Sequence, residues 1–501
     1  MGNLKIGWAA RNVSTESPVN IQGQFCMRIS LGVYDPLYAA ALVLDDGGDA
    51  VIFLSIDIAA IRGGMLDDIR AAVYAINPEI PAEKILANAT HTHEAPAAVK
   101  ADFKMAGSGY QQSEMPLNGM DVEPSNVYRE FLIKNCAEAV DEAWNKRSEG
   151  GIAYGYGYAV VGHSRRVVYF DDISKRGGNV DSLMVDGYGK MYGNTNDSQF
   201  SHYEAGADHF INILYTFDPI GKLTGAVVNV PCPSQSSEHD YKLSADFWHE
   251  IRGQIREKHG DIFILPQCAA GGDLSPRILH YKKAQERRFR LKHGDMEHNR
   301  AERADIAGRV AVSFDEVLSW AKKDIKSEIK ITHRVETIDL NKRLVTEDEY
   351  KFAKEGLAQL AGEQYKTSGD TPENMLTYNS VLVSRRLRYE RVIERYDGQA
   401  SEKTIPLELH VVKVGDIAFA SNIFELYMDY MHRIQARSPF EQTFVVQLAG
   451  TFGELGGTYL PTIRGAQAKG YSASVFCNTV SPEGGQQLVE ETVRVLNEIY
   501  E

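Results

Sequence analysis

The hydrophobic residues of the N-terminal part of the chain fall into short uninterrupted runs. Residues 40–44 and 51–56 are two such runs, and they are joined across an Asp/Gly-rich turn at residues 45–48, which predicts a β-hairpin. Residues 65–76 then carry apolar side chains at helical spacing, and residues 85–87 form a further apolar run. An order of strand, helix and strand favours an α/β fold.

Further along the chain, apolar runs typical of strands alternate with charged segments typical of helices. The predicted strands cover residues 210–215, 226–230, 262–265, 407–414 and 417–424. No repeat or linker divides the sequence, so we predict one α/β domain over residues 1–501, a large mixed β-sheet flanked by helices, with a helical insertion at about 346–400. The arginine-rich run over residues 385–391 is expected to be a solvated helix face.

The overall charge and the cysteine pattern exclude several classes of protein. The 501 residues carry a formal net charge of −14, which argues against nucleic acid and anionic membranes as partners. The five cysteines are scattered and form no Cys-x-x-Cys pair, so neither a disulfide framework nor a zinc knuckle is predicted. The sequence contains no signal peptide and no long apolar segment, so we expect a cytoplasmic protein without membrane insertion, or a secreted one if a leader has been removed. The sequence is compatible with a homo-oligomer.

The first candidate for chemistry is the sequence Thr-His-Thr-His-Glu-Ala-Pro, which follows the apolar run at residues 85–87. His91 and His93 stand two positions apart, so at the period of a strand both rings point to one side. Two imidazoles on one face suit a divalent metal or proton transfer. The alternative, two structural loop histidines, is the more common meaning of an isolated His-x-His.

Other strands also end at polar or glycine-rich sequences. One of these reads Gly-Gly-Asp-Leu-Ser-Pro and ends in Ser275, but it lacks the spacing of a P-loop or of a Gly-x-Ser-x-Gly elbow. Arg165 and Arg166 follow another strand, where paired guanidinium groups can bind a carboxylate or phosphate, or simply lie in solvent.

Four of these motifs, taken in order, resemble the catalytic domain of the neutral/alkaline, non-lysosomal ceramidases, a family of zinc-dependent amidases. They are Thr-His-Thr-His-x-x-Pro, Gly-Asp-Leu-Ser-Pro, a late strand-terminal glutamate, and Tyr459 followed twelve residues later by Tyr471. The resemblance extends over most of the chain. The C-terminal immunoglobulin-like domain of true ceramidases has no counterpart in it.

The resemblance implies a zinc (Zn) site with His91, Glu425 and Tyr459 among its ligands. It also implies three groups that contact the reacting substrate: His93, Tyr471 and Ser275. Arg165 matches an arginine that lies near the ligand in the family.

One expected zinc ligand differs from the family pattern. Cys232-Pro233 stands where the family has a His-Pro pair. Cys232 is therefore expected to ligate zinc as a thiolate, or else to be a buried neutral cysteine beside an altered or lost metal site. His239 and Glu238 are alternative ligands.

The arginines give an indication of the substrate. Arg165, Arg166 and Arg277 bring positive charge toward the predicted pocket, which suits an anionic or polyhydroxylated compound better than an uncharged lipid. We therefore predict a zinc-dependent hydrolase that uses metal-activated water to cleave an amide or ester in a polar, anionic or carbohydrate-derived substrate, either a small molecule or an oligosaccharide. The alternatives are a glycoside hydrolase or lyase acting on uronic-acid glycans, and a non-catalytic binding protein on the same scaffold.

Overall fold

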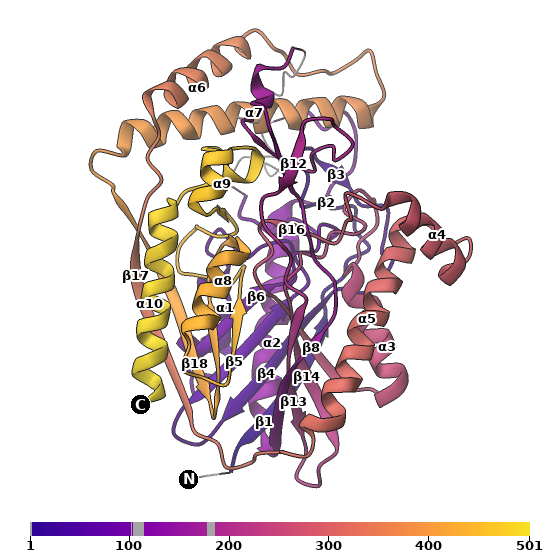
Figure 1. Ribbon diagram of the computed structural model, residues 1–501, viewed down its shortest axis with the longest axis vertical. Helices are drawn as coiled ribbons and strands as arrows, with labels where there is room; N and C mark the ends of the chain where they lie inside the picture. The colour runs from indigo at the N-terminus through magenta and orange to yellow at the C-terminus, as the bar shows by residue number, and fades with distance from the viewer. Residues whose placement is uncertain (1–2, 102, 104–114, 178–185) are drawn as a thin grey trace.

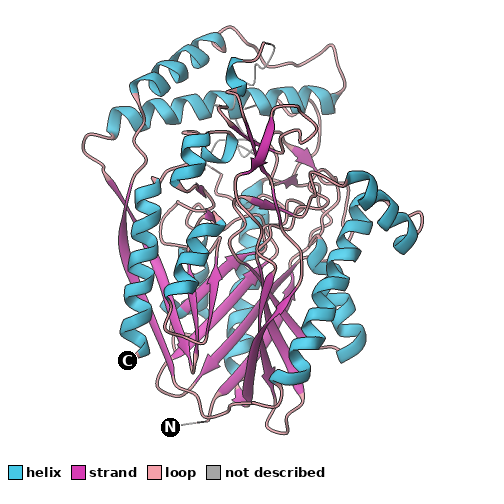
Figure 2. Cartoon of the chain, in the orientation of Figure 1, coloured by secondary structure: helices cyan, strands magenta, loops and turns pink. Residues whose placement is uncertain are grey.

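Three larger β-sheets pack around a shared apolar core (Figures 1 and 2). The computed structural model describes residues 3–101, 103, 115–177 and 186–501. The first sheet has the order β6 (Ile85–Ala89), β5 (Ala50–Ile56), β4 (Tyr38–Asp45), β1 (Lys5–Asn12) and β7 (Ser148–Glu149). The second has the order β15 (Phe263–Cys268), β14 (Leu223–Val230), β13 (Phe210–Phe217) and β8 (Gly151–Tyr158). The third has the order β17 (Ile331–Asn341), β18 (Thr404–Val414), β19 (Ile417–Ser421) and β21 (Gln442–Val446).

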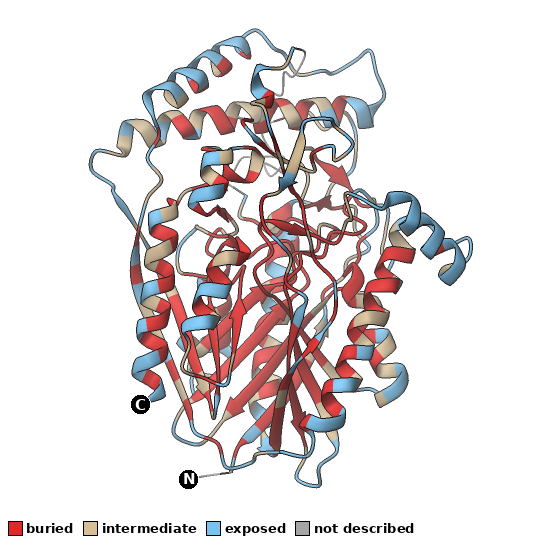
Figure 3. Cartoon of the chain, in the orientation of Figure 1, coloured by how far each residue is buried: buried red, intermediate tan, exposed pale blue. Residues whose placement is uncertain are grey.

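The strands of the first sheet are apolar along their whole length because both of their faces are buried. In β4, Ala41 and Val43 belong to the core beneath the helices, whereas Leu42 and Leu44 point into the core between the sheets. A strand buried on both sides needs no alternation of polar and apolar residues. The exposed surface is carried mainly by the outer faces of the helices and by loops (Figure 3).

Helices cover the outer face of each larger sheet. The first sheet packs against α2 (Ser125–Asn145), which also contacts α1 (Met65–Ile76). The second sheet packs against α5 (His298–Ala321), beside α3 (Phe247–His259) and α4 (Lys282–His293). The third packs against α8 (Met428–Arg437) and α10 (Pro482–Tyr500).

The remaining elements are short strands and two helices at one end of the molecule. The short pairs are β2 (Asn20–Ile21) with β3 (Arg28–Ile29), β9 (His163–Ser164) with β16 (Leu274–Ser275), and β20 (Glu425–Leu426) with β22 (Tyr459–Leu460). A small sheet contains β11 (Gly189–Met191), β10 (Arg166–Tyr169) and β12 (Phe200–Tyr203). The helices α6 (Glu347–Gln359) and α7 (Pro372–Gly398) lie together across the top of Figure 1, near α9 (Ile463–Ala468).

These elements confirm the predicted mixed α/β class, with the strands divided among several sheets. The predicted hairpin is β4 with β5, and the predicted helix at residues 65–76 is α1. The C-terminal residues form α10, which packs on β17 and β18, and no immunoglobulin-like sandwich occurs in the described ranges. Helices occupy the range predicted as an insertion, and its status as an insertion remains a prediction. In the described part of the chain, no helix is long and apolar enough to cross a bilayer.

Candidate active site

A cavity of about 170 Å³ lies between α7 and the polar ends of several strands. Five residues singled out in the sequence line it, although they come from distant segments: His91, His93, Glu425, Tyr459 and Tyr471. The two histidines follow β6, Glu425 begins β20, Tyr459 begins β22, and Tyr471 begins a short 3₁₀ turn. The fold therefore brings together most of the predicted catalytic and metal-binding residues.

His91 is held in a constrained position with one ring nitrogen facing a carboxylate. Its backbone has φ 64°, a left-handed conformation that is uncommon outside glycine and often found at functional sites. The ring Nδ1 lies 2.5 Å from the carbonyl oxygen of Ala59, which can only accept, so Nδ1 carries the proton. The lone pair on Nε2 then faces Glu425 Oε2 at 3.3 Å. Two such electron-rich atoms are stable together only when a cation or an added proton lies between them.

Glu425 and Tyr459 are neighbours because β20 and β22 run parallel, with these two residues in register. Arg165 is buried beside both: its Nη2 lies 3.6 Å from Glu425 Oε2 and 3.3 Å from the Tyr459 hydroxyl. Burial alone would raise the pKa of the Glu425 carboxyl, but the neighbouring imidazole, guanidinium and phenol lower it to about 2. Glu425 is therefore ionised at neutral pH.

His93 is fixed by a chain of hydrogen bonds that also defines its tautomer. Arg165 can only donate, so the oxygen of Gln235 accepts from it at 3.1 Å, and the amide nitrogen of Gln235 donates to His93 Nε2 at 2.9 Å. The ring proton therefore sits on Nδ1, which lies 3.2 Å from Glu238 Oε2. Burial lowers the pKa of His93 to about 4, although the carboxylate acts in the opposite direction. His93 is thus a neutral, oriented imidazole at neutral pH.

Gly23 packs directly against the ring of His93. Its φ is +115°, and a Cβ built there would lie 2.3 Å from His93 Cγ, so no other residue fits without moving the ring. Gln22 and Gln24 line the cavity on either side of this glycine. Nothing in the spacing of these residues indicates a site, so this part of the cavity was not predicted.

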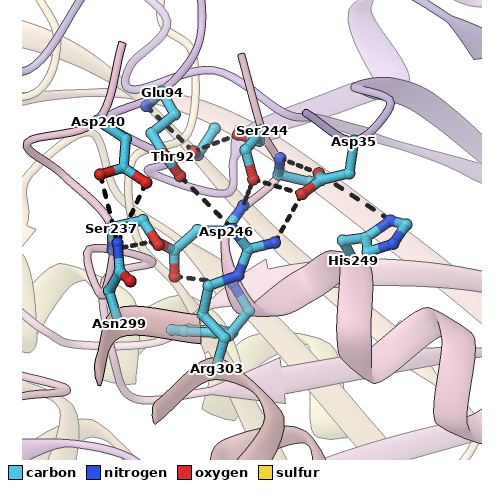
Figure 4. A network of polar contacts seen from close by, with 12 residues as sticks. Asp35, Thr92, Glu94, Ser237, Asp240, Ser244, Asp246, His249, Asn299 and Arg303 are labelled. Carbon is cyan, nitrogen blue, oxygen red and sulfur yellow. Dashed lines mark hydrogen bonds and ion pairs between the residues drawn. The ribbon is translucent and has the colours of Figure 1, made fainter. Parts of the chain in front are cut away.

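The loop that carries both histidines is anchored by a buried polar network on the side of α3 and α5 (Figure 4). The Thr92 hydroxyl donates to the carbonyl oxygen of Ser244 at 2.7 Å, and the backbone NH of Ser244 donates to the carbonyl oxygen of Glu94 at 3.0 Å. Ser244 Oγ in turn donates to Asp35, which also accepts from Arg303. Thr92 and Glu94 therefore help to fix the two rings without lining the cavity themselves.

The implied zinc site can be tested against these donors. His91 Nε2 is a buried atom without a hydrogen-bond partner, and the Glu425 carboxylate and Tyr459 phenol lie beside it. Within the residues that the structure describes, no group of three or more His, Cys, Asp and Glu side chains could hold a metal ion, so any ligand set at this cavity needs the phenol as its third donor. Catalytic zinc sites use three protein ligands and keep one position open. His91 and Glu425 supply two donors of the usual types, and the third would be the phenol of Tyr459, whose pKa is raised well above its ordinary value by burial.

Two predicted site residues do not line the cavity. Cys232 is fully buried, its thiol donates to the carbonyl oxygen of Pro233 at 3.4 Å, and burial raises its pKa well above the ordinary value. A neutral thiol turned toward the backbone agrees with the alternative of a buried neutral cysteine, and ligation of a metal by Cys232 stays a prediction. Ser275 is also fully buried, and it accepts hydrogen bonds from the backbone of Arg277 and from the Tyr192 hydroxyl. A direct contact of Ser275 with the substrate is therefore not supported.

The alternative ligands at residues 238 and 239 lie elsewhere. Glu238 contacts His93, as described above, and Arg277 forms an ion pair with Glu238 at 2.7 Å. The side chain of His239 is mainly exposed, its Nε2 lies 3.8 Å from Glu238 Oε1, and it is not among the residues that line the cavity.

The three arginines predicted to bind the substrate already have protein partners. Arg166 is fully buried, forms a 2.6 Å ion pair with Glu204 and donates to Ser472. Arg165 contacts Glu425, and Arg277 pairs with Glu238. Arg166 is thus the most fully paired of the three and does not line the cavity, and substrate binding by Arg165, Arg166 and Arg277 stays a prediction.

A different set of arginines lines the cavity: Arg62, Arg388, Arg391 and Arg395. Three of them lie on one face of α7, and two of these, Arg388 and Arg391, belong to the run expected to be solvated. Arg391 is exposed as expected, but Arg388 is only 5% exposed, which overturns the expectation for that residue. Arg388, Arg391 and Arg395 are three and then four residues apart, and this spacing places all three side chains on one side of a helix. The sequence therefore held a signal for a cluster of arginines on one helix face.

The fold is that of ceramidase-like α/β proteins, as comparison with solved structures shows. A ceramidase complexed with C2 shares the fold with a TM-score of 0.66 and 14% sequence identity, over 100% of this chain and 76% of that one. The neutral ceramidase from Pseudomonas aeruginosa does so with a TM-score of 0.65 and 14% identity, over 99% of this chain and 75% of that one. Neither a family model nor a curated protein sequence matches the chain. The resemblance inferred from the sequence motifs is thus confirmed at the level of the fold.

Proposed function

We propose that the chain is a hydrolase that cleaves an amide or ester bond in a polar substrate, with a zinc ion held by His91, Glu425 and Tyr459. The observation that carries this proposal is the 3.3 Å approach of His91 Nε2 to Glu425 Oε2 in the wall of the cavity. A fold shared with ceramidases supports it. When bound in such a site, zinc would polarise the scissile carbonyl and would lower the pKa of a bound water toward about 7.

The residues around the donors have separate tasks. His93 holds its proton on Nδ1 against Glu238, which leaves Nε2 able to accept a proton once a substrate or water displaces Gln235. Burial raises the pKa of the Tyr471 hydroxyl, so it remains a neutral hydrogen-bond donor facing the cavity. A donor placed against a developing oxyanion contributes about 3–4 kcal/mol to the barrier reduction.

The proposal is tested by a substrate screen with and without a chelator. Acyl-amides, esters and lactones should be turned over by the purified protein, and the turnover should be lost on chelation and restored by added zinc. The His91→Ala variant should be inactive under both conditions. Hydrolysis that is indifferent to the chelator would show that the metal assignment is wrong.

A second candidate is a hydrolase or lyase acting on uronic-acid glycans, which the cationic face of α7 favours. Arginines can neutralise a uronate carboxylate while a histidine or tyrosine acts as base. Including uronic oligosaccharides in the screen distinguishes the two, because elimination yields products that absorb in the ultraviolet. Amide-only turnover excludes this candidate, and a protein with neither metal nor turnover would instead be a binding protein.

A further inference from the structure

The cavity has two chemically different walls. One carries the histidines, Glu425 and the tyrosines, and the other is formed by α7 and the loop of Arg62. Among the described lining residues, only Ala59, Val392 and Val475 are aliphatic. Amide and hydroxyl groups of Gln22 and Thr458 add to the polar lining. Phe25 and Phe476 add aromatic surface beside the arginines, so the cavity offers a charged group both cationic partners and ring faces.

Arg388 is the most unusual residue of the α7 wall. Its guanidinium group lies over the rings of Phe25 and Tyr471, 4.8 and 5.6 Å from their centroids. Its Nη2 makes one long contact, 3.5 Å, with the sulfur of Cys477, and its Nη1 is buried without a hydrogen-bond partner. Among the ion pairs of the described residues, none involves Arg388. A buried cation with an unmatched NH group is costly unless a ligand supplies the missing acceptor.

The neighbouring arginines increase the positive charge at this wall. The pKa of Arg391 is lowered by partial loss of solvent around its guanidinium group and by the nearby Arg62, although the residue keeps an exposed surface. Burial and the closeness of two other arginines likewise lower the pKa of Arg395 to about 10, although it donates to the carbonyl oxygens of Val475 and Arg343. Glu394 and Glu454 act in the opposite direction on the pKa of Arg391, as Glu349 does on that of Arg395, so these two arginines are partly compensated by carboxylates.

The positions of the aromatic rings relate this wall to the reacting groups. The ring of Tyr471 contacts Arg388 on one side and lies 5.7 Å, centroid to centroid, from the ring of Tyr459 on the other. Tyr459 in turn stands beside Glu425. About one ring therefore separates the unmatched guanidinium from the predicted catalytic centre.

We propose that Arg388, supported by Arg62, Arg391 and Arg395, is the anion-binding subsite of this cavity, and that the substrate carries an oxyanion close to the bond that is cleaved. A carboxylate, as in a uronate, and a sulfate ester both present the required oxygen atoms. The inference rests on the proposed function in assigning the anion to a substrate, but the binding of an anion does not depend on turnover.

The test is calorimetric titration of the full chain at low ionic strength with glucuronate, glucose and inorganic sulfate. Glucuronate should bind and glucose should not, and sulfate should compete if the subsite accepts tetrahedral anions. A carboxylate-selective site would bind glucuronate alone, whereas a sulfate-selective site would bind sulfate more tightly. Either result supports the subsite and identifies its anion. Equal binding of glucuronate and glucose without sulfate binding would overturn it.

Three variants test whether the binding of glucuronate depends on Arg388. Arg388→Gln should weaken binding about tenfold or more, as expected for loss of a charge-assisted hydrogen bond. Arg386→Gln is the matched control, because it removes the same charge from the same helix, where Arg386 donates to the carbonyl oxygen of Glu363 outside the cavity. Arg388→Lys should restore part of the affinity, and it replaces the glutamine variant if that one does not fold. Folded Arg388 variants that bind glucuronate as tightly as the unaltered chain would contradict the assignment.

Failure of this inference and failure of the proposed function give different results. His91→Ala should abolish turnover while leaving glucuronate binding intact. Turnover of uncharged amides without anion binding would refute the subsite alone, and anion binding without any turnover would refute the hydrolase alone.

Discussion

The two walls of the cavity differ in the kind of buried polar atom that each leaves without a hydrogen-bond partner. On the wall of strand ends, His93, Gln235 and Arg165 each contact a partner, and the buried Nε2 of His91 presents a lone pair without a donor. On the α7 wall, a buried guanidinium keeps an NH group without an acceptor. A lone pair suits a bound cation and an NH group suits an anion, which is the basis of the proposals that the first wall holds a metal and the second a negatively charged group of the substrate.

The largest expected effect is on the wall of strand ends. Glu425→Gln removes the charge that would hold a cation beside His91, so turnover should fall about a thousandfold, in proportion to the several kcal/mol that a catalytic metal supplies. The rate constants are compared by steady-state kinetics, with thermal unfolding as a check that the variant is folded. If Glu425→Gln keeps most of its activity, the wall of strand ends does not hold a catalytic metal.

A smaller effect is expected where the same wall orients a base. Glu238→Gln leaves the ring proton of His93 without its carboxylate partner, so kcat should fall about a hundredfold while KM changes little. The control is Glu302→Gln, which alters another buried acid, on α5, that does not line the cavity. Equal losses in both variants would point to a general effect of buried charge.

A change at Gly23 tests how tightly the ring of His93 must be held. Gly23→Ala places a methyl group against the ring, so activity should fall about tenfold. Gly47→Ala serves as the matched control, because Gly47 also has a positive φ, +83°, but nothing lies within 4 Å of a Cβ built there. The control should lose some stability and no activity. Loss of activity in both variants would trace the effect to backbone strain.

The smallest effect is expected at Cys232. Because its thiol points to the backbone, Cys232→Ser should retain metal and change turnover by less than about threefold. Metal analysis measures the metal content of the variant, and kinetics on the same preparation measure its turnover. Loss of the metal in this variant would return Cys232 to the ligand set and remove the need for Tyr459.

The wall of strand ends could be predicted from the sequence, whereas the α7 wall could not. His91, Glu425 and Tyr459 stand at strand ends within short motifs, and the fold brings such ends together. Arg388 lies in a dense charge run, whose usual meaning is a solvated helix face. Its burial depends on how α7 crosses the strand ends, and that placement arises from tertiary packing rather than from any local pattern.

Tertiary packing also decides which of the arginines predicted as substrate-binding groups are paired within the protein. Arg166 stands next to Arg165 in the sequence and was expected to act with it. The partner that fixes Arg166 is Glu204, thirty-eight residues away, and no spacing rule relates the two. Long-range ion pairs of this kind decide which arginines remain available to a ligand.

Metal content in the two histidine variants tests the central claim most directly. The purified chain and His93→Ala should each hold about one zinc ion, His91→Ala should hold none, and both variants should lose turnover. This result would separate the metal-binding ring from the proton-transferring ring. Absence of metal from every preparation, or its loss from His93→Ala but not from His91→Ala, would contradict the account.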